Sequence, residues 1–437
     1  MIESFRNIFK IPDLQKRVFF TLALLVVYRI GAHIPTPGID GQALSAFFSR
    51  AQGTILSFMD MFSGGALGRL TIFALGIMPY ISASIILDLL TVVFPFLEKL
   101  KKEGEQGRKK LTQYTRYSTV LISAIQAFGI SIGLENMTSP DGAPIVMLPG
   151  WSFRFTTALT LTAGTIFIMW LGEQITERGI GNGMSLIIFS GIVTDMPSAA
   201  INTIRLLRTG EMSIFWLLGL LILMVVVVGV IVFMEAGHRK IPIQYAKRVV
   251  GRRMYGGQST HLPLKVNTSG VIPPIFASSV IMFPATIAQF SGLPWMNTIS
   301  SYLLPGTWVY TILFVGAIFF FCYFYTAIIF NPVDVADNIK KYGGFIPGKR
   351  PGKSTAEFID KTLARITFGG AVYLSAICVL PDFLFKFNPN IPFYYGGTSL
   401  LIVVGVAMDT MQQIESHLVM RHYEGFINKG RLRGRRG

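Results

Sequence analysis

Apolar stretches of about twenty residues alternate along the chain with short polar segments. A helix needs roughly 20 mainly apolar residues to cross the hydrocarbon core of a bilayer, so each stretch is a candidate membrane span. The pattern predicts ten spans, at residues 18–38, 70–94, 115–135, 153–173, 184–204, 214–235, 270–290, 307–331, 366–386 and 396–418. The second and the seventh of these are interrupted by glycine and proline. The pattern therefore predicts an all-α membrane protein.

Composition agrees with this interpretation. Of the 437 residues, 51% are hydrophobic and 14% are charged, whereas soluble proteins carry about 25% charged residues. The only two cysteines, Cys322 and Cys378, lie inside apolar runs, which excludes a disulfide framework and a cysteine-rich metal site. No small-residue cleavage site follows the first apolar run, so we expect that run to be a retained span and not a removable signal peptide.

The positive charge is concentrated on one side of the predicted topology. Ten spans place both termini on the same side of the membrane. On that side fall 32 of the 39 lysines and arginines, in the N-terminal segment, the loops 2–3, 4–5, 6–7 and 8–9, and the C-terminal tail. Because lysine and arginine accumulate in cytoplasmic loops, this side is predicted to be the cytoplasm. An error of one span would scatter the charge, so the asymmetry supports the count.

Three basic loops dominate the predicted cytoplasmic face. They connect spans 2 and 3, spans 6 and 7, and spans 8 and 9. One interpretation is that they only set the topology and contact anionic lipids. That interpretation suffices for the 2–3 loop. The other two loops are longer and more basic than topology requires, which favours a docking surface for a large polyanionic or acidic partner.

The two halves of the chain share a sequence pattern. Gly76, Pro79 and Ile81 in the second span recur at the same spacing as Gly270, Pro273 and Ile275 in the seventh span. The fifth and tenth spans match as well, in the segments 183–188 and 397–402. Five spans per half force the halves into opposite orientations, as in many channels and transporters. We therefore expect an inverted repeat of residues 1–210 and 211–437 around a central pathway.

The prolines of the second and seventh spans are predicted to break their helices. Proline lacks the backbone N–H donor and clashes with the preceding helical turn. Such a break is tolerated at membrane depth only against protein or water, so Pro79 and Pro273 are expected to face the interior. An ordinary kink in a packed helix is the alternative.

Six isoleucines could converge on the predicted axis. Ile81 and Ile85 share one helical face, as do Ile188 and Ile192, because residues four apart lie above one another on a helix. The repeat pairs Ile81 with Ile275, and Ile188 with Ile402. An apolar constriction of this kind blocks ions by excluding water. Without the repeat, each would be an ordinary packing residue.

A small, glycine-rich segment precedes the second span. It is too polar for a lipid-facing helix, and a short re-entrant helix inside the protein fits it better than an extracellular loop, which is the alternative. The residues concerned are Phe62, Ser63, Gly64, Gly65, Ala66, Leu67, Gly68, Arg69 and Leu70.

No catalytic or nucleotide-binding motif is present. The sequence lacks a Walker A segment, HExxH, CxxC and G-x-S-x-G, and the glycines of 179–183 lack the lysine and the preceding strand of a phosphate loop. No cofactor is therefore expected. A coupled transporter of a small solute is the main alternative to a channel. It usually places carboxylates deep in its spans, whereas few carboxylates fall inside the spans here, Asp88 and Asp409 among them.

Long segments of the chain resemble the bacterial SecY family. They read GIMPYISASI, LGEQITERGIGNGMSLIIFSGI, YAKRVVGRRMYGGQSTHLPLKVNTSGVIPPIFASS, IPGKRPG and PFYYGGTSLLIVVGVAMD, and the resemblance extends in order over nearly the whole chain. It implies a channel through which unfolded polypeptides and signal sequences cross the cytoplasmic (inner) membrane or leave sideways into lipid. It also implies that the isoleucines form a pore ring and that the segment from Phe62 is a plug.

The resemblance also implies where partners bind. A lateral gate would lie between helices 2 and 3 on one side and 7 and 8 on the other. The SecA motor and the ribosome would contact the 6–7 and 8–9 loops, and SecE and SecG would be companion subunits. The contact residues implied for SecA and the ribosome are Arg248, Arg252, Arg253, Lys349 and Arg350.

Overall fold

A computed structural model describes residues 11–50, 60, 63–135, 144–194, 196–210, 213–245, 248–250, 253–255, 260–291, 302–303, 306–387 and 397–429. The chain divides into two compact units. The first contains Met1–Asn202, Ala285–Ser300 and Ile402–Gly437, and the second contains Thr203–Pro284 and Ser301–Leu401.

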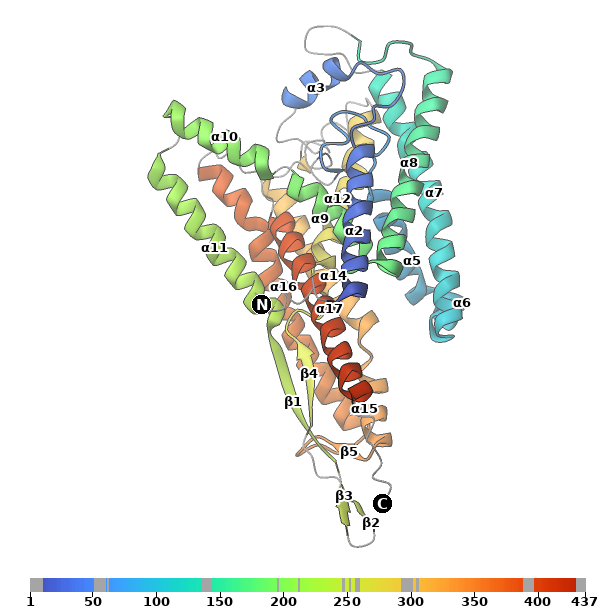
Figure 1. The fold of residues 1–437 in the computed structure, drawn as a ribbon, viewed down its shortest axis with the longest axis vertical. Helices are drawn as coiled ribbons and strands as arrows, with labels where there is room; N and C mark the ends of the chain where they lie inside the picture. Colours follow the sequence, from blue (N-terminus) through green and yellow to red (C-terminus); the bar gives the residue numbers. More distant parts are fainter. Residues whose placement is uncertain are drawn as a thin grey trace. The chain divides into compact units, whose positions relative to one another are not determined.

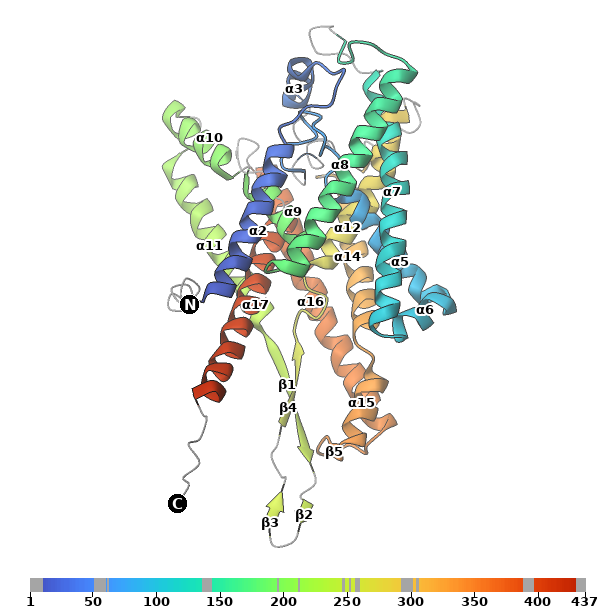
Figure 2. The same cartoon turned by 45° about the vertical axis from the view of Figure 1, so that its right-hand side comes forward.

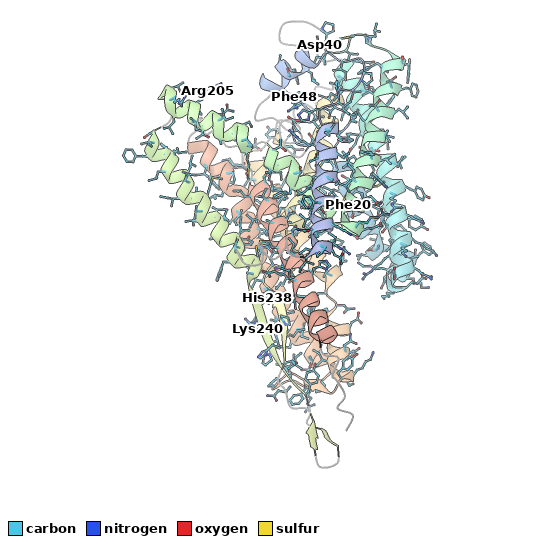
Figure 3. The ribbon with its side chains drawn as sticks, in the orientation of Figure 1. Phe20, Asp40, Phe48, Arg205, His238 and Lys240 are labelled. Carbon is cyan, nitrogen blue, oxygen red and sulfur yellow. The ribbon has the colours of Figure 1, made fainter. Side chains whose placement is uncertain are left out.

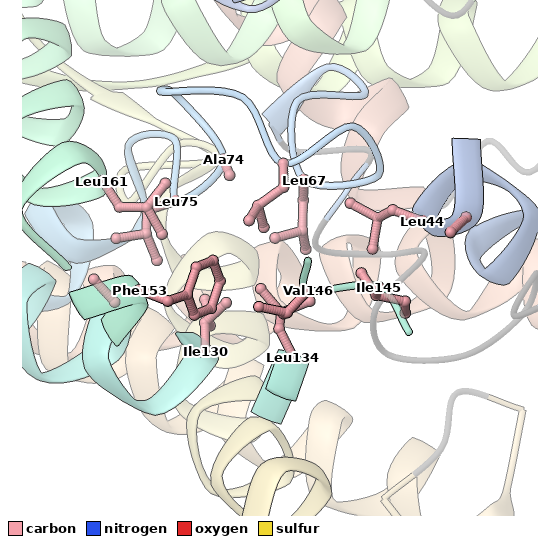
Figure 4. Packing of buried hydrophobic residues seen from close by; sticks show 13 residues of the cluster. Leu44, Leu67, Ala74, Leu75, Ile130, Leu134, Ile145, Val146, Phe153 and Leu161 are labelled. Carbon is pink, nitrogen blue, oxygen red and sulfur yellow. The ribbon is translucent and has the colours of Figure 1, made fainter. Parts of the chain in front are cut away.

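The first unit is built from helices α2 to α9 and most of α17. Its long neighbours α7 and α8 lie side by side (Figures 1 and 2). Its buried apolar core includes Leu67, Leu75 and Leu161 (Figure 4). The helices are α2 (Pro12–Gly31), α3 (Gly41–Arg50), α5 (Met78–Val93), α6 (Pro95–Lys102), α7 (Glu105–Glu135), α8 (Trp151–Arg178), α9 (Gly183–Thr194) and α17 (Gly397–Lys429).

The second unit combines apolar helices with small sheets. Its helices are α11 (Ile214–Ala236), α14 (Trp308–Ile329), α15 (Pro332–Lys341) and α16 (Lys353–Phe387), together with the second half of α10 (Met196–Thr209) and most of α12 (Ile272–Ser291). The strands are β1 (His238–Tyr245), β2 (Arg248–Val250), β3 (Arg253–Tyr255), β4 (Thr260–Lys265) and β5 (Gly344–Phe345). The strand order β4-β1-β5 is antiparallel throughout, and β2 pairs with β3 in a separate hairpin.

The β1–β4 ribbon, which the sequence pattern did not predict, leaves the end of α11 and carries β2 and β3 farther along (Figures 1 and 2). Buried and exposed side chains alternate along part of β1, because successive side chains of a strand point to opposite faces of the sheet. Ile241, Ile243 and Leu264 pack with Ile339 of α15 and Ile359 of α16 in one apolar cluster. The 6–7 and 8–9 loops of the predicted topology therefore fold together.

Each predicted span overlaps a helix, and several helices qualify as membrane spans. Among the described residues, six helices are long and apolar enough to cross a membrane. They are Glu105–Glu135, Trp151–Arg178, Gly183–Thr209, Ile214–Ala236, Trp308–Lys341 and Lys353–Leu384. Helices α5 and α6 pass the same test together but are bent by 101°. A multi-pass membrane protein follows from these helices, and the number ten stays a prediction.

Several helix boundaries differ from those expected. Helix α7 begins at Glu105 and α16 at Lys353, well before the predicted spans at 115 and 366. Polar lysine, glutamate and glutamine are good helix formers, so a helix continues beyond its apolar segment. The second predicted span behaves oppositely. Residues 70–77 form turns, and α5 begins only at Met78.

Candidate functional site

Helix α5 begins at a turn that glycine makes possible. Gly76 has φ 55°, a left-handed conformation that glycine adopts without the steric penalty of a Cβ atom. Pro79 follows in the first turn of the helix, where its missing N–H would have no helical partner in any case. Ile81 and Ile85 are buried on the face that follows. The turn thus starts a new helix after a non-helical segment.

Helix α12 begins in the same way. Gly270 has φ 63°, and Pro273 is the second residue of the helix. One turn later, the hydroxyls of Ser278 and Ser279 donate hydrogen bonds of 2.9 and 2.8 Å to the carbonyl oxygen of Ile275. Ile275 itself is half-buried. The spacing shared by the two segments in the sequence therefore corresponds to a shared backbone conformation.

The remaining predicted pore residues lie on α9 and α17. Ile188, Ile192 and Ile402 are buried. Five of the six isoleucines, all except Ile275, belong to the first compact unit. Convergence of the six on one ring stays a prediction.

Both α9 and α17 begin at a glycine that touches backbone. A Cβ atom added at Gly183 would collide with the carbonyl oxygen of Gly172 in α8. A Cβ atom added at Gly397 would collide with the carbonyl oxygen of Ile377 in α16. In the order of predicted spans, these are helices 4 and 5 of one half and helices 9 and 10 of the other. These two helix pairs therefore share a close helix–backbone contact as well as a sequence pattern.

The predicted plug segment is a compact set of turns, of which Phe62 lies outside the described residues. The carboxylate of Asp60 accepts a hydrogen bond of 2.7 Å from the backbone N–H of Gly68. The hydroxyl of Ser63 accepts one of 3.1 Å from Leu67 and donates one of 2.9 Å to the carbonyl of Asp60. Except for Gly65 and Arg69, residues 63–70 are buried. Local hydrogen bonds thus hold the segment in a defined shape.

Two side chains of α2 hold the same segment from outside. The guanidinium of Arg29 donates a hydrogen bond of 2.9 Å to the carbonyl of Gly64, and the hydroxyl of Tyr28 donates one of 3.3 Å to the carbonyl of Ser63. Gly64 has φ 66°, and a Cβ atom added there would lie 2.9 Å from the Cα atom of Gly191. Arg29 is one of the seven lysines and arginines that lie outside the predicted cytoplasmic segments. Its position inside the first predicted span, 18–38, was the available signal.

The C-terminal end of this segment is anchored by backbone pairing and ring stacking. Thr36 donates from its backbone to the carbonyl of Leu70 (2.9 Å), and Ile72 donates to the carbonyl of Ile34 (3.0 Å). The ring of Phe73 stacks between Tyr28 and Phe167, with centroids 5.8 and 5.9 Å away. These anchoring residues could not be predicted from the sequence, because an aromatic side chain such as Phe73 within a run of apolar residues gives no distinct signal.

The basic residues expected to bind partners lie on the strands and turns of the second unit. Arg248 begins β2 and Arg253 begins β3, whereas Arg252 lies outside the described residues. Lys349 and Arg350 are exposed in a turn before α16. The hydroxyl of Thr355 donates a hydrogen bond of 2.8 Å to the carbonyl of Arg350. His238 and Lys240 on β1 add exposed basic groups near the end of α11 (Figure 3).

A polar knot closes the base of the ribbon and was not found from the sequence. The side-chain amide of Asn267 donates hydrogen bonds to the carboxylate of Glu235, at 2.5 Å, and to the carbonyl of Gly270, at 3.0 Å. The hydroxyl of Ser269 donates to the amide oxygen of Asn267 at 3.2 Å. Asn267 and Ser269 are buried. The knot therefore joins the end of α11 to the start of α12.

No group of three or more histidine, cysteine, aspartate or glutamate side chains that could hold a metal ion occurs among the residues the structure describes. The site consists of apolar side chains, turns and hydrogen bonds to backbone. Such a constellation can line, close or gate a passage.

Comparison with known proteins assigns this architecture. The family model SecY matches residues 71–411. The chain is 52% identical to the protein translocase subunit SecY of Escherichia coli (strain K12) over 426 residues, which cover 97% of this chain and 96% of the relative. The chain belongs to the SecY family. It is also 50% identical to the SecY subunit of Pseudomonas aeruginosa, over 97% of this chain and 95% of the relative.

Solved structures of SecY-like channels share the fold. A protein-conducting channel superimposes with a TM-score of 0.64 at 18% identity, covering 92% of both chains. Sec61 in the canine ribosome-channel complex gives a TM-score of 0.60 at 16% identity, again covering 92% of both chains. These identities are low, so these neighbours establish the fold of the SecY family for this chain and not its partners.

Proposed function

We propose that this chain is the pore-forming subunit of a channel that passes unfolded polypeptides across a membrane or sideways into it. The observation that supports this most strongly is 52% identity, over almost the whole length of both proteins, to a protein translocase subunit. A channel of this kind needs no catalytic group of its own. A bound motor or a ribosome supplies the driving force.

The architecture that fits this function is ten membrane helices in two inverted halves, residues 1–210 and 211–437. Two features shared by the halves, a turn and a contact, support the repeat. Gly76 and Gly270 share a left-handed turn before a proline, and Gly183 and Gly397 both meet a backbone carbonyl of the preceding long helix. Inverted repeats place a pathway where their broken helices face each other. In the proposed channel, helices 2 and 3 and helices 7 and 8 border a lateral gate.

The six isoleucines form the proposed pore ring, with the segment 62–70 as a plug beside it. A translocating chain presents every type of side chain, so the constriction cannot depend on specific hydrogen bonds. Flexible apolar side chains close around many shapes and still exclude the water that ions need. Burial of five of the six isoleucines is consistent with an idle, closed passage.

Basic loops serve as the proposed docking surface. Ribosomal RNA is polyanionic, and clustered lysines and arginines bind it by releasing counterions. A ribosome-bound Sec61 channel shares this fold, and the ribbon and the turn at Arg350 present exposed cations. We include SecA, SecE, SecG and anionic lipids among the proposed partners. The proposed location is the cytoplasmic (inner) membrane, with both termini in the cytoplasm, where positive-inside topology places the basic loops.

Site-specific crosslinking tests the pore. A photoreactive amino acid at position 81 or 188 should crosslink to a polypeptide stalled in the channel. The control is position 159 on α8, where Leu159 is 75% exposed and so faces away from the protein interior. Crosslinks at position 159 as strong as those at 81 and 188 would refute the proposed ring.

A charge reversal tests the docking surface. Arg350→Glu should impair motor-driven export while the protein still accumulates normally in the membrane, because Arg350 is exposed and the backbone carbonyl that accepts from Thr355 is kept in the variant. Export assays with membrane vesicles, together with protein levels, measure the two effects. Normal export by this variant would exclude the role of Arg350.

A further inference from the structure

The segment that contains the plug has two ends that are held differently. Residues 71–77 form a base: Thr71 bridges to Pro35, Ile72 pairs with Ile34, and Phe73 stacks between two rings. The backbone of α8 also presses on this base, since a Cβ atom added at Gly164 would collide with the carbonyl oxygen of Ile72. Moving the base would require α2 and α8 to separate.

Residues 63–69 are bonded mainly within their own segment. Most of their hydrogen bonds are internal, between Asp60, Ser63, Leu67 and Gly68. From elsewhere come the side chains of Tyr28 and Arg29 and the backbone of Gly191. Thr71 of the base also donates two hydrogen bonds to the carbonyl of Ala66, of 2.9 Å from its backbone N–H and 3.3 Å from its hydroxyl. Leu67 adds one apolar side chain to the core beside Leu134 and Val146 (Figure 4). Residues 63–69 could therefore move as a unit once these contacts, including the two from Thr71, are lost.

A residue in an unusual conformation lies at the boundary. Leu70 has φ 40°, and it is the one residue other than glycine with a positive φ in the described part of the chain. L-residues with a Cβ atom rarely adopt this conformation, which clusters at active sites, ligand clamps and switch regions. Leu70 stands between the internally bonded residues 63–69 and the anchored base.

Arg29 supplies the strongest of the outside contacts. A hydrogen bond from a charged guanidinium is stronger than one between neutral groups, and its distance to the Gly64 carbonyl is 2.9 Å, against 3.3 Å for that of Tyr28. The acceptor is a backbone atom, so it is present whatever side chains the segment carries. Arg29, a cation near the end of the apolar helix α2, therefore holds the plug segment through the backbone of Gly64.

We propose that Arg29 is the latch that retains the plug in the idle channel, and that the plug moves about Leu70 while residues 71–77 stay fixed. This inference rests on the proposed function, in which the segment 62–70 is the plug. Arg29 acts as a positioning residue. Tyr28 supports it with the second hydrogen bond from the same turn of α2.

Cysteine labelling tests the latch directly. Ala66 and Ala74 are both buried, on the proposed moving part and on the base respectively. Each is replaced by cysteine in a chain carrying Cys322→Ala and Cys378→Ala, and the assembled, idle complex is reacted in nanodiscs with a water-soluble maleimide. Because one charge-assisted hydrogen bond shifts an equilibrium by about tenfold, Arg29→Gln should raise the labelling rate at position 66 by about tenfold. The rate at position 74 should stay unchanged.

Matched variants complete the design. Arg29→Lys keeps a charged donor and should restore slow labelling, whereas Arg205→Gln removes an exposed arginine from α10 and should change nothing. Ser63→Cys is a second, nearly isosteric reporter should Ala66→Cys disturb packing. Tyr28→Phe keeps the ring stack but loses the hydroxyl. It tests the latch if Arg29→Gln does not assemble. We expect it to raise labelling at position 66 less than Arg29→Gln does.

Two outcomes would overturn the proposal. Unchanged labelling at position 66 in Arg29→Gln would show that Arg29 does not retain the segment. An equal rise at positions 66 and 74 would show that the whole segment moves and that Leu70 is not the boundary. Labelling reports position and requires no transport, so either result leaves the proposed function standing. The crosslinking test at positions 81 and 188 judges that function separately.

Discussion

Two helices of this chain, α5 and α12, begin with the same turn in different surroundings. Each follows a glycine in the left-handed conformation, Gly76 or Gly270, and each has a proline near its start. Before α5 lies a buried, internally bonded segment held by α2. Before α12 lies the base of an exposed basic ribbon, tied to α11 by Glu235.

The two halves share the turn and the proline at the start of the helix, whereas the segment before the turn differs between them. The turn and the proline define where each helix starts, and both halves retain them. The segment that leads into the turn is not constrained by the predicted repeat, so the proposed plug can precede one turn and the proposed docking ribbon the other. In the proposed channel, the two differing segments are the parts that would respond to the substrate and to the partner.

The largest expected effect comes from the closest contacts of the repeat. Gly183→Ala and Gly397→Ala each place a methyl group against a backbone carbonyl, which cannot rotate away as a side chain could. Each should lower the free energy of unfolding by about 3 kcal/mol, because helices in a packed protein must separate to admit the methyl group. Unfolding of the purified complex in detergent measures the loss.

Gly129→Ala and Gly369→Ala are the matched controls. Both glycines lie within helices, and a Cβ atom added at either would meet nothing within 4 Å. These variants should be as stable as the parent or slightly more stable, since alanine favours helix over glycine. A large loss at Gly183 with none at Gly397 would break the proposed equivalence of the two helix pairs.

The sequence predicted the helices well and their boundaries poorly. Long apolar runs allowed each of the ten spans to overlap a helix, and the repeat was visible in the glycines and prolines at equal spacing. An apolar run, however, indicates which residues contact lipid and not where the helix ends. The start of α7 at Glu105 therefore could not be predicted from the apolar pattern. For the second span the error was reversed, since the apolar residues 70–77 form turns.

The candidate site was predicted in its residue types but not in its contacts. The glycine-rich segment 62–70 was identified from its composition, whereas the Arg29–Gly64 hydrogen bond joins residues 35 positions apart and ends on a backbone carbonyl. A backbone acceptor leaves no trace in the identity of the residue that provides it. The Glu235–Asn267 knot has the same difficulty, because each residue alone resembles an ordinary loop or helix-end residue.

A smaller effect is expected at the polar knot that only the second half contains. Glu235→Ala leaves the buried amide of Asn267 without its carboxylate acceptor. Loss of one partner of a buried hydrogen bond should cost about 2 kcal/mol. Faster hydrogen exchange of the peptide spanning residues 266–275 should accompany the loss, because the knot precedes the start of α12.

Glu235→Gln and Asn267→Ala sharpen this test. Glutamine retains an oxygen acceptor and should cost less than alanine. The double variant Glu235→Ala, Asn267→Ala should cost less than the sum of its two single variants, since the two residues share one interaction. Strict additivity of the two losses would contradict a knot between them.

The smallest effect concerns the shared turn itself. Gly76→Ala and Gly270→Ala force an L-residue into φ 55° and 63°. Each should cost about 1 kcal/mol, the usual penalty for a Cβ atom in the left-handed region. The surroundings add little, because a Cβ atom at Gly76 would come no closer than 3.6 Å to Ser63 and one at Gly270 would meet nothing within 4 Å. Asparagine, which tolerates this conformation, should cost less than alanine at both positions.

Equal losses in detergent unfolding would support one turn used twice. A loss at Gly76 several times that at Gly270 would show that the buried plug segment, and not the turn, determines how α5 begins.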